Sequence, residues 1–193
     1  MIMQLILASQ SPRRRELLGL FGLPFTVYVA DIDETMAAGK APEREVARVS
    51  RAKAEAVCRK PEDVVIAADT VVVLEGTILG KPRDAEEAIA MLTTLSGKSH
   101  QVMTGLTVLR GQKVLVHTEV TDVQFRQLSP KEIEAYVSTG EPMDKAGSYG
   151  IQGRGGLFVE RIQGDYYNVM GLPVCRLYQM LKEIIPEIME DIQ

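Results

Sequence analysis

Two short, continuous apolar runs constrain the fold of this chain more than any other feature. Leu5–Ala8 and residues 64–68 each have the length and composition of a strand that is buried on both faces. Ser11 and Pro12 then mark the start of a helix, and residues 41–59 form a long amphipathic pattern with helical period. This alternation of strand and helix predicts an α/β fold.

The length and composition fit one folded domain. The chain has 193 residues, of which 46% are hydrophobic, so it can bury a core without a disulfide or a zinc ion. This composition excludes a disordered chain, and the lack of a repeat excludes a fibrous one. We expect a single domain over residues 1–193, in which a long hairpin and a helix at roughly residues 98–140 form a second lobe beside a cleft.

The charge balance and the cysteines indicate which binding partners and which cellular compartment to expect. The 22 lysines and arginines and the 26 aspartates and glutamates give a net charge of −4, which argues against a globally basic nucleic-acid binder. Cys58 and Cys175 have neither metal nor redox spacing and suit a reducing compartment. Leu5–Ala8 is too short for a signal peptide or a membrane span. We therefore expect a soluble cytoplasmic protein that binds neither membranes nor nucleic acid.

Turn and capping residues predict where the other elements begin and end. The strand at residues 64–68 is expected to end at Asp69, and two long strands are expected at about residues 100–109 and 114–125. Residues 157–162 and 166–170 have the pattern of a last hairpin. Capping-box spacing opens two further helices, at Asp84 with Glu87 and at Ser129 with Glu132.

The first candidate site lies where the first strand meets its helix, around Ser9, Arg13 and Arg14. Free N–H groups and the positive end of the helix dipole point to this place, and hydroxyls with guanidinium groups complete a cradle for phosphate. A simple helix cap with solvated arginines explains the residues equally well. Three consecutive arginines in a net acidic chain favour an anionic ligand.

Lys53 is the second candidate, because it falls in the apolar stripe of its predicted helix. It follows Val46 by seven residues and Val49 by four, so it lies on the inward face. A buried ammonium is costly without a partner. The alternative is a snorkelling lysine, with its stem buried and its charge in water.

Carboxylates supply the third group of candidates. Asp69 follows a buried strand, where it can hold a divalent metal or act as a general base on water; the alternative is a turn aspartate that bonds its own backbone. Glu34, from the acidic loop after the second strand, can join Asp69 as a metal ligand, together with Asp31 or Asp33. A solvated turn is the plainer reading of that loop.

Lys81 and a glycine-dense segment complete the constellation. Lys81 lies in a loop before a capped helix and can either meet a phosphate or remain exposed. Residues 147–156 contain five glycines, which let the backbone approach a ligand closely. The chain has no dinucleotide fingerprint, Walker loop, serine nucleophile elbow or zinc spacing. The combination of cations and carboxylates at loops favours metal-assisted phosphoryl chemistry on a nucleotide.

Four motifs in register give a more specific indication. They are residues 7–14 (LASQSPRR), 68–70 (ADT), 80–82 (GKP) and 144–153 (DKAGSYGIQG). Together they resemble the Maf family of nucleoside triphosphate pyrophosphatases, over about residues 5–180. The resemblance implies a mixed twisted sheet with flanking helices and two lobes around a cleft, similar to the inosine triphosphate pyrophosphatases. It also implies hydrolysis of a nucleoside triphosphate to the monophosphate and pyrophosphate, a divalent cation (Mg²⁺ or Mn²⁺) and a homodimer.

The resemblance assigns roles at matching positions. Asp69 matches the family's general base, and Glu34 matches an acidic position of the metal site that Asp69 shares. Positions that bind phosphates are matched by Ser9, Arg13, Lys53 and Lys81.

Three further positions divide the family by substrate, and here they hold Arg14, Thr70 and Gln152, as in the branch that hydrolyses dTTP and UTP. Modified pyrimidines such as 5-methyl-UTP and pseudo-UTP are implied substrates by the same analogy. The family is also linked to arrest of septum formation, so the alternative function is a non-catalytic nucleotide-binding regulator of cell division.

Overall fold

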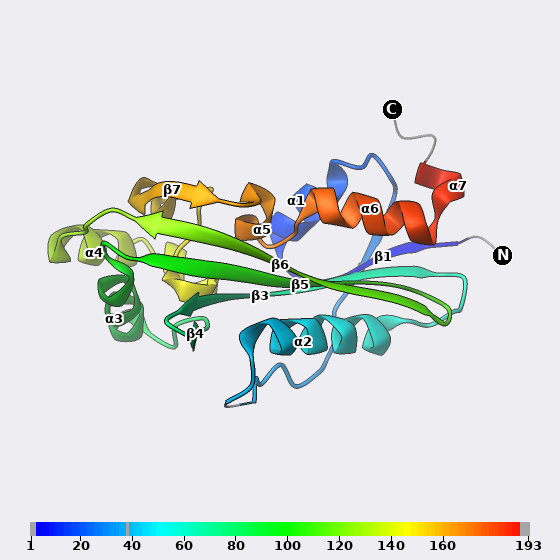
Figure 1. The fold of residues 1–193 in the computed structure, drawn as a ribbon, viewed down its shortest axis with the longest axis horizontal. Helices are drawn as coiled ribbons and strands as arrows, with labels where there is room; N and C mark the ends of the chain where they lie inside the picture. The colour runs from blue at the N-terminus through cyan, green and yellow to red at the C-terminus, as the bar shows by residue number, and fades with distance from the viewer. Residues whose placement is uncertain (1–2, 38, 190–193) are drawn as a thin grey trace. The chain divides into compact units, whose positions relative to one another are not determined.

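A computed structural model describes residues 3–37 and 39–189 of the chain (Figure 1). The strands are β1 (Leu5–Ala8), β2 (Thr26–Tyr28), β3 (Val64–Leu74), β4 (Thr77–Leu79), β5 (Ser99–Arg110), β6 (Lys113–Phe125) and β7 (Val159–Gln163). The helices are α1 (Pro12–Gly19), α2 (Pro42–Val57), α3 (Ala85–Leu95), α4 (Pro130–Val137), α5 (Tyr166–Met170), α6 (Val174–Ile184) and α7 (Pro186–Met189). Short 3₁₀ turns occupy Glu141–Asp144, Ala146–Ser148 and Arg154–Phe158.

The strands form one mixed sheet. Its order is β2-β1-β3-β5-β6-β7, and β4 pairs with β3 outside this path. Strand β1 runs parallel to both β2 and β3, whereas the pairs β3–β4 and β6–β7 are antiparallel. The predicted α/β class with a mixed sheet and flanking helices is therefore confirmed.

The chain forms two compact units. The first unit contains the described residues up to Asp69, residues 104–119 and the described residues from Gly171 onward; the second contains residues 70–103 and 120–170. Strands β3, β5 and β6 each contribute residues to both units. The single domain over residues 1–193, with its second lobe at about 98–140, stays a prediction.

The core of the first unit is built from β1, the first half of β3 and one face of α2. The amphipathic pattern of α2 buries Val46, Val49 and Val57, and every residue of β1 is buried. The helix backbone lies directly on strand β5, because a Cβ added at Gly105 would be 2.2 Å from the carbonyl oxygen of Val46. A glycine is therefore required at the point where α2 crosses β5.

The second unit has its own core, with aromatic rings in edge-to-face contact. The ring centroids of His100 and Phe125 are 4.9 Å apart, and those of Phe125 and Tyr149 are 4.7 Å apart. The Nε2 atom of His100 and the hydroxyl of Tyr149 are hydrogen-bonded at 2.8 Å. Burial lowers the pKa of His100 to about 4, so its ring is neutral at pH 7.

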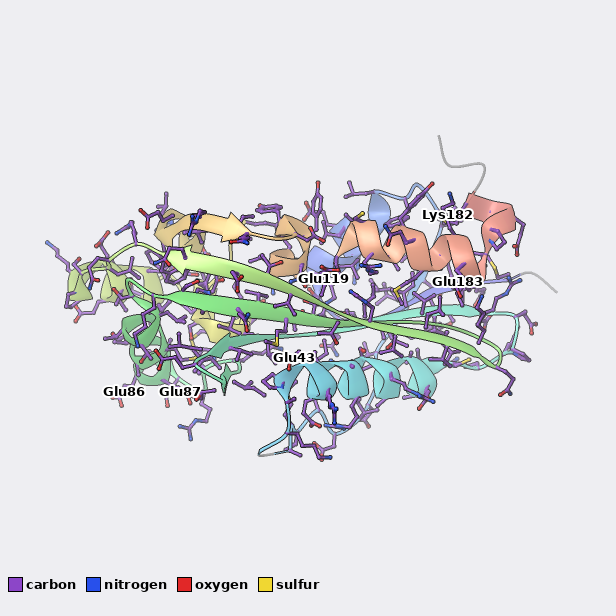
Figure 2. All side chains as sticks on the ribbon, viewed as in Figure 1. Glu43, Glu86, Glu87, Glu119, Lys182 and Glu183 are labelled. Carbon is purple, nitrogen blue, oxygen red and sulfur yellow. The ribbon has the colours of Figure 1, made fainter. Side chains whose placement is uncertain are left out.

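Helices α3 and α6 place apolar side chains inward and charged ones outward. Helix α3 buries Ala88, Leu92 and Leu95, and α6 buries a similar stripe. Figure 2 shows Glu86 on α3 and Lys182 on α6 pointing away from the helix axes, in agreement with their exposure. No helix within residues 3–37 and 39–189 is both long enough and apolar enough to cross a membrane.

Two predicted elements differ from the structure. Strand β3 does not end at Asp69 but continues through it to Leu74, since partners described below compensate the buried carboxylate. Residues 166–170 form helix α5 rather than the second strand of a hairpin. The side chain of Asp165 accepts a hydrogen bond from Tyr167 N at 2.8 Å, which is a helix-capping contact that outweighs the strand preference of the two tyrosines.

The two predicted capping boxes have different outcomes. Ser129 and Glu132 form the full reciprocal box at the start of α4. At α3, Asp84 accepts a hydrogen bond from Glu87 N at 2.8 Å, but the Glu87 carboxylate accepts from the backbone and side chain of Arg83 instead of returning to Asp84. Only the first half of that second box is formed.

Candidate active site

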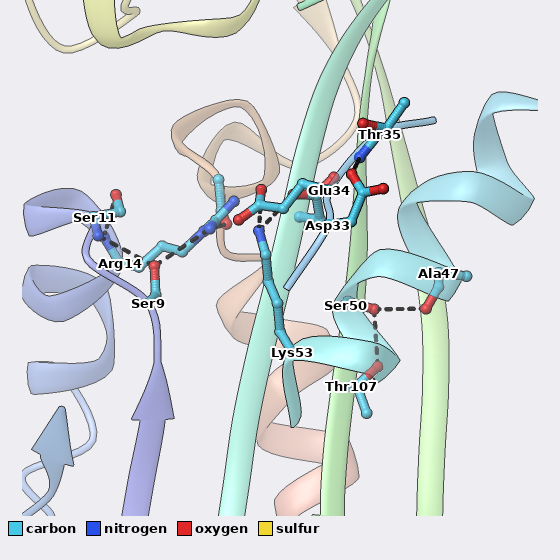
Figure 3. Close-up of polar contacts among 12 residues, drawn as sticks. Ser9, Ser11, Arg14, Asp33, Glu34, Thr35, Ala47, Ser50, Lys53 and Thr107 are labelled. Carbon is cyan, nitrogen blue, oxygen red and sulfur yellow. Dashed lines mark hydrogen bonds and ion pairs between the residues drawn. The ribbon is translucent and has the colours of Figure 1, made fainter. Parts of the chain in front are cut away.

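Lys53 lies at the centre of a buried ionic cluster in the first unit. Its Nζ atom donates hydrogen bonds to Glu34 Oε2 at 2.7 Å and to Asp69 Oδ1 at 2.8 Å (Figure 3). The Lys53 side chain is 9% exposed and that of Asp69 is 10% exposed. Lys53 is therefore not a snorkelling residue, because its ammonium is buried and paired with two carboxylates.

Asp69 occupies the interior of a strand, where a carboxylate is rare. It is buried among apolar neighbours on β3, which follow on both sides of the Asp69–Thr70 pair. An unpaired charge there would cost several kcal/mol, so the ammonium of Lys53 is needed to keep Asp69 in place. Asp69 thus faces the site from a rigid strand and not from a flexible loop end.

Glu34 is the carboxylate of the acidic loop that reaches the cluster. Its side chain is 54% exposed, so it has one side on Lys53 and the other open to solvent. Asp33 instead accepts a hydrogen bond from Thr35 N at 2.8 Å, and hydrogen bonds from the side chain and the backbone of Thr35 together lower the pKa of Asp33. Asp31 is exposed. Among the three acidic candidates, Glu34 is the one that the structure brings to Lys53.

Helix α2 holds the loop of Glu34 at two further points. Arg48 Nη2 donates to the carbonyl oxygen of Thr35 at 2.8 Å, and Glu45 Oε2 accepts from Ala37 N at 2.9 Å. Arg48 and Glu45 also pair with each other at 3.0 Å, and this hydrogen bond lowers the pKa of Glu45. One helix therefore supplies both the central cation, Lys53, and the contacts that fix its exposed partner.

Glu45 and Arg48 were not predicted from the sequence, although a signal was present. Glu45, Val49 and Lys53 are spaced four residues apart and share the inward face of α2. A glutamate in an apolar stripe raises the same question as a lysine does, because both need a partner when buried.

The first turn of α1 brings Ser9 and Arg14 together. Ser11 caps the helix by accepting from Arg14 N at 3.4 Å, and Ser9 Oγ accepts from Ser11 N at 3.2 Å and from Arg14 Nη1 at 3.3 Å. Arg14 Nε also donates to the carbonyl oxygen of Gly171 at 2.8 Å. The guanidinium is thus fixed from two sides before any ligand binds.

Arg14 also interacts electrostatically with the carboxylates of the ionic cluster. Burial lowers the pKa of Arg14 and neighbouring Arg13 lowers it further, while the negative charges of Asp69 and Glu34 act in the opposite direction. In Figure 3 the Arg14 side chain extends from α1 towards Glu34 and Lys53. The structure therefore gathers Ser9, Arg14 and the three members of the cluster in one region of the first unit. Arg13 belongs to the same helical turn and is half-buried.

The remaining predicted residues lie in the second unit. Lys81 and Gln152 are exposed, and Thr70 is half-buried on β3. Gly147 N donates to the carbonyl oxygen of Gly80 at 3.0 Å, which joins the motif of Lys81 to the motif of Gln152. The predicted residues are thus divided between the two units.

The donors of the first unit suit a hard divalent cation. Within residues 3–37 and 39–189, no group of three or more His, Cys, Asp or Glu side chains is arranged to hold a metal. Mg²⁺ is commonly bound through only one or two protein carboxylates, with substrate phosphates and water completing its ligands. Asp69 and Glu34, which meet at one ammonium, fit that pattern.

A comparison with known families agrees with the motifs. The model of the family described as Maf-like protein matches residues 4–184. The chain belongs to the Maf-like protein family. The resemblance to this family, based on four motifs in the sequence, is confirmed.

Two curated relatives of this Maf-like chain share a functional name. A dTTP/UTP pyrophosphatase from Symbiobacterium thermophilum is 53% identical over 181 residues, which cover 93% of each protein. A dTTP/UTP pyrophosphatase from Bacillus cytotoxicus is 50% identical over 179 residues, covering 92% of this chain and 94% of the relative. Among solved structures, a HAM1 protein from Coxiella burnetii has a similar fold, with a TM-score of 0.53 and 14% identity, covering 94% of this chain and all of that protein.

Proposed function

We propose that this Maf-like chain hydrolyses dTTP and UTP to the monophosphate and pyrophosphate. The observation that carries the proposal is the buried ammonium of Lys53, which holds Asp69 and Glu34 together beside Arg14. A pair of carboxylates next to fixed cations suits the cleavage of a phosphoanhydride bond. The shared name of the two relatives supplies the substrates.

The cations of the first unit bind the phosphate chain in this proposal. The α1 N-terminus offers its positive dipole end, and Arg13 and Arg14 add guanidinium groups that can bind phosphate oxygens in a forked geometry. Ser9 contributes a hydroxyl that already contacts Arg14. Because Arg14 is held by Ser9 and Gly171, it loses little side-chain freedom when a phosphate binds.

Asp69 is the proposed general base. It accepts the proton of the attacking water, while the ammonium of Lys53 keeps its carboxylate in one orientation. Lys53 then has a second role, since it provides positive charge beside the phosphate on which negative charge develops. The position of Asp69 inside a strand suits this task, because strand residues hold their geometry better than loop residues.

The charge balance of the cluster supports a divalent cation. Arg14 and Lys53 together balance Asp69 and Glu34, so these four side chains leave no excess positive charge for a polyanionic triphosphate. We propose that Glu34 and Asp69 would hold Mg²⁺ or Mn²⁺, which when bound supplies Lewis-acid stabilisation of the phosphates. The exposed side of Glu34 leaves room for such a role.

The second unit supplies residues for substrate choice. Lys81 is proposed to contact the phosphates, and Thr70 and Gln152 to select a pyrimidine. A glutamine amide both donates and accepts, so it can match the edge of a uracil or thymine ring. Modified pyrimidine triphosphates that keep this edge are proposed substrates as well.

Pyrophosphate release over a panel of nucleoside triphosphates tests the proposal. With Mg²⁺ or Mn²⁺ present we expect turnover of dTTP and UTP above that of the purine nucleotides, and chelation by EDTA should abolish it. A preference for purine triphosphates, or no turnover at all, would contradict the proposal. The alternative of a non-catalytic regulator of septum formation is not favoured, because the two relatives are named as pyrophosphatases. The cytoplasmic location and the homodimer stay predictions.

A further inference from the structure

The loop that carries Gln152 lies between two short 3₁₀ turns, Ala146–Ser148 and Arg154–Phe158. Gln152 itself is exposed, and five glycines occur within residues 147–156. Glycines give a backbone more freedom than other residues do. A side-chain amide on such a loop can distinguish one base edge from another only if the backbone beneath it is held in place.

Glu141 provides that support through three hydrogen bonds. Its Oε2 atom accepts from Arg154 N at 3.1 Å, and its Oε1 atom accepts from Gly155 N at 3.3 Å and from the Tyr136 hydroxyl at 3.0 Å. Burial acts to raise the pKa of Glu141, but these hydrogen bonds outweigh it and the net pKa is lowered. The carboxylate therefore remains ionised at neutral pH and keeps all three donors bound.

The packing around Glu141 closes the loop on both sides of Gln152. A Cβ added at Gly153 would be 2.3 Å from Glu141 Oε1, so only a glycine fits against the carboxylate. On the other side of Gln152, the stem of Lys145 lies beneath Gly150, and Lys145 Nζ donates to the Glu141 carbonyl oxygen at 2.6 Å. Glu141 thus touches the loop after Gln152 directly and the loop before it through Lys145.

We propose that Glu141 is a positioning residue for nucleobase selection, holding the backbone around Gln152 so that its amide presents a fixed donor and acceptor to the pyrimidine edge. The inference rests on the proposed function. UTP and CTP share a ring size but differ in that edge, since CTP carries an amino group where UTP carries a carbonyl. A fixed amide favours one arrangement, whereas a mobile amide adapts to both.

The test compares kcat/KM for UTP with kcat/KM for CTP in matched variants. In Glu141→Ala the ratio of the two should fall about tenfold, the size expected from the loss of one or two hydrogen bonds. Gly153→Ala should act in the same direction, because the new methyl group displaces the carboxylate. Glu141→Gln keeps the shape and part of the acceptor capacity and should show a smaller fall. Glu160→Ala, an exposed carboxylate on β7, is the control and should leave the ratio unchanged.

A double variant separates positioning from a general loss of structure. If Glu141 acts through Gln152, then Glu141→Ala combined with Gln152→Ala should be no less selective than Gln152→Ala alone. Equal losses for UTP and CTP in both Glu141→Ala and Gly153→Ala would overturn the inference. If Glu141→Ala fails to fold, Glu141→Gln and Gly153→Ala decide the question. If the wild-type chain hydrolyses neither nucleotide, the proposed function fails, and the same ratio measured by calorimetric binding of UTP and CTP then tests Glu141 separately.

Discussion

The ionic cluster of the first unit and the glycine-rich loop of the second are fixed in opposite ways. In the cluster, side chains from α2, β3 and one loop hold each other through ion pairs, and the elements that carry Lys53 and Asp69 are regular. In the loop, one side chain, that of Glu141, holds backbone N–H groups that belong to no strand or long helix. The cluster fixes the positions of charged side chains, whereas Glu141 fixes the conformation of a loop backbone.

Substitutions in the two regions should therefore have different effects. Removing one member of the cluster leaves an opposite charge buried, so stability and turnover should change together for every nucleotide. Removing Glu141 leaves three neutral donors and no unpaired charge among them, so the main effect should be on the definition of the loop and on selectivity.

The largest effect is expected for Lys53→Met. The substitution leaves Asp69 as an unpaired charge in the core, and the free energy of unfolding should fall by about 3 kcal/mol in urea titrations at pH 7. Adding Asp69→Asn to Lys53→Met should restore part of this loss, since the unpaired charge is then absent. Lys182→Met, at an exposed position of α6, is the control. A loss no larger than that of the control would show that the ion pair does not stabilise the first unit.

Asp69→Asn should lower turnover at least about a hundredfold, which is the usual contribution of a general base. The loss should be equal for UTP and CTP, because Asp69 is proposed to act on water and not on the base. Pyrophosphate release under single-turnover conditions measures both rates, with Glu55→Gln on the exposed face of α2 as the control. Turnover near that of the wild type would show that another residue is the general base. A change in the ratio of the UTP and CTP turnover rates would show that the cluster also affects base selection.

The second unit should dominate the response to mild acid. His100 binds a proton more readily in the unfolded chain than in the fold, because burial lowers its pKa from the usual 6.5 to about 4. Its contribution to stability is therefore present above pH 6.5 and is lost as the pH falls towards 4. Between pH 7 and pH 5 the wild type should lose about 2 kcal/mol more than His100→Gln does. An unchanged pH dependence in His100→Gln would contradict the assignment.

The smallest effect is expected for Glu45→Ala. This substitution removes the acceptor of Ala37 N and a partner of Arg48, so the loop of Glu34 loses one of its attachments to α2. We expect kcat/KM to fall about tenfold for all nucleotides, the size of one charge-assisted hydrogen bond. Glu43→Ala, on the exposed face of the same helix, should leave it unchanged. If Glu45→Ala matches the control, Lys53 alone is sufficient to hold Glu34.

The sequence predicted the ionic cluster better than it predicted the strand that carries part of it. Lys53 stands out by its place in an apolar stripe, and its need for a carboxylate leads to Asp69. The polar pair at residues 69–70 predicts the end of a strand, because a buried carboxylate is costly by itself. The partner that removes this cost comes from another element, so the continuation of β3 to Leu74 depends on tertiary contacts and not on local preference.

Helix α5 is a second element that local sequence preference does not predict. Tyr166 and Tyr167 favour a strand by propensity, yet Asp165 caps a helix there. The buried side chain of Asn168 then donates to Val102 O and to Thr121 Oγ1, both at 3.0 Å. Contacts between residues about fifty positions or more apart in the chain select this helix, and no local pattern contains them. The role of Glu141 was missed for the same reason, because its partners on the loop are 13 and 14 residues away.

The close approach at Gly105 has a consequence for the whole cluster. With a hydrogen atom in place of a side chain, β5 lets α2 rest on its backbone, where even one methyl group would overlap Val46 O. The positions of Lys53, Arg48 and Glu45 all depend on the distance between α2 and the sheet. Gly105 thereby sets the distance between α2 and the sheet, and adding a single methyl group there would displace Lys53, Arg48 and Glu45 together.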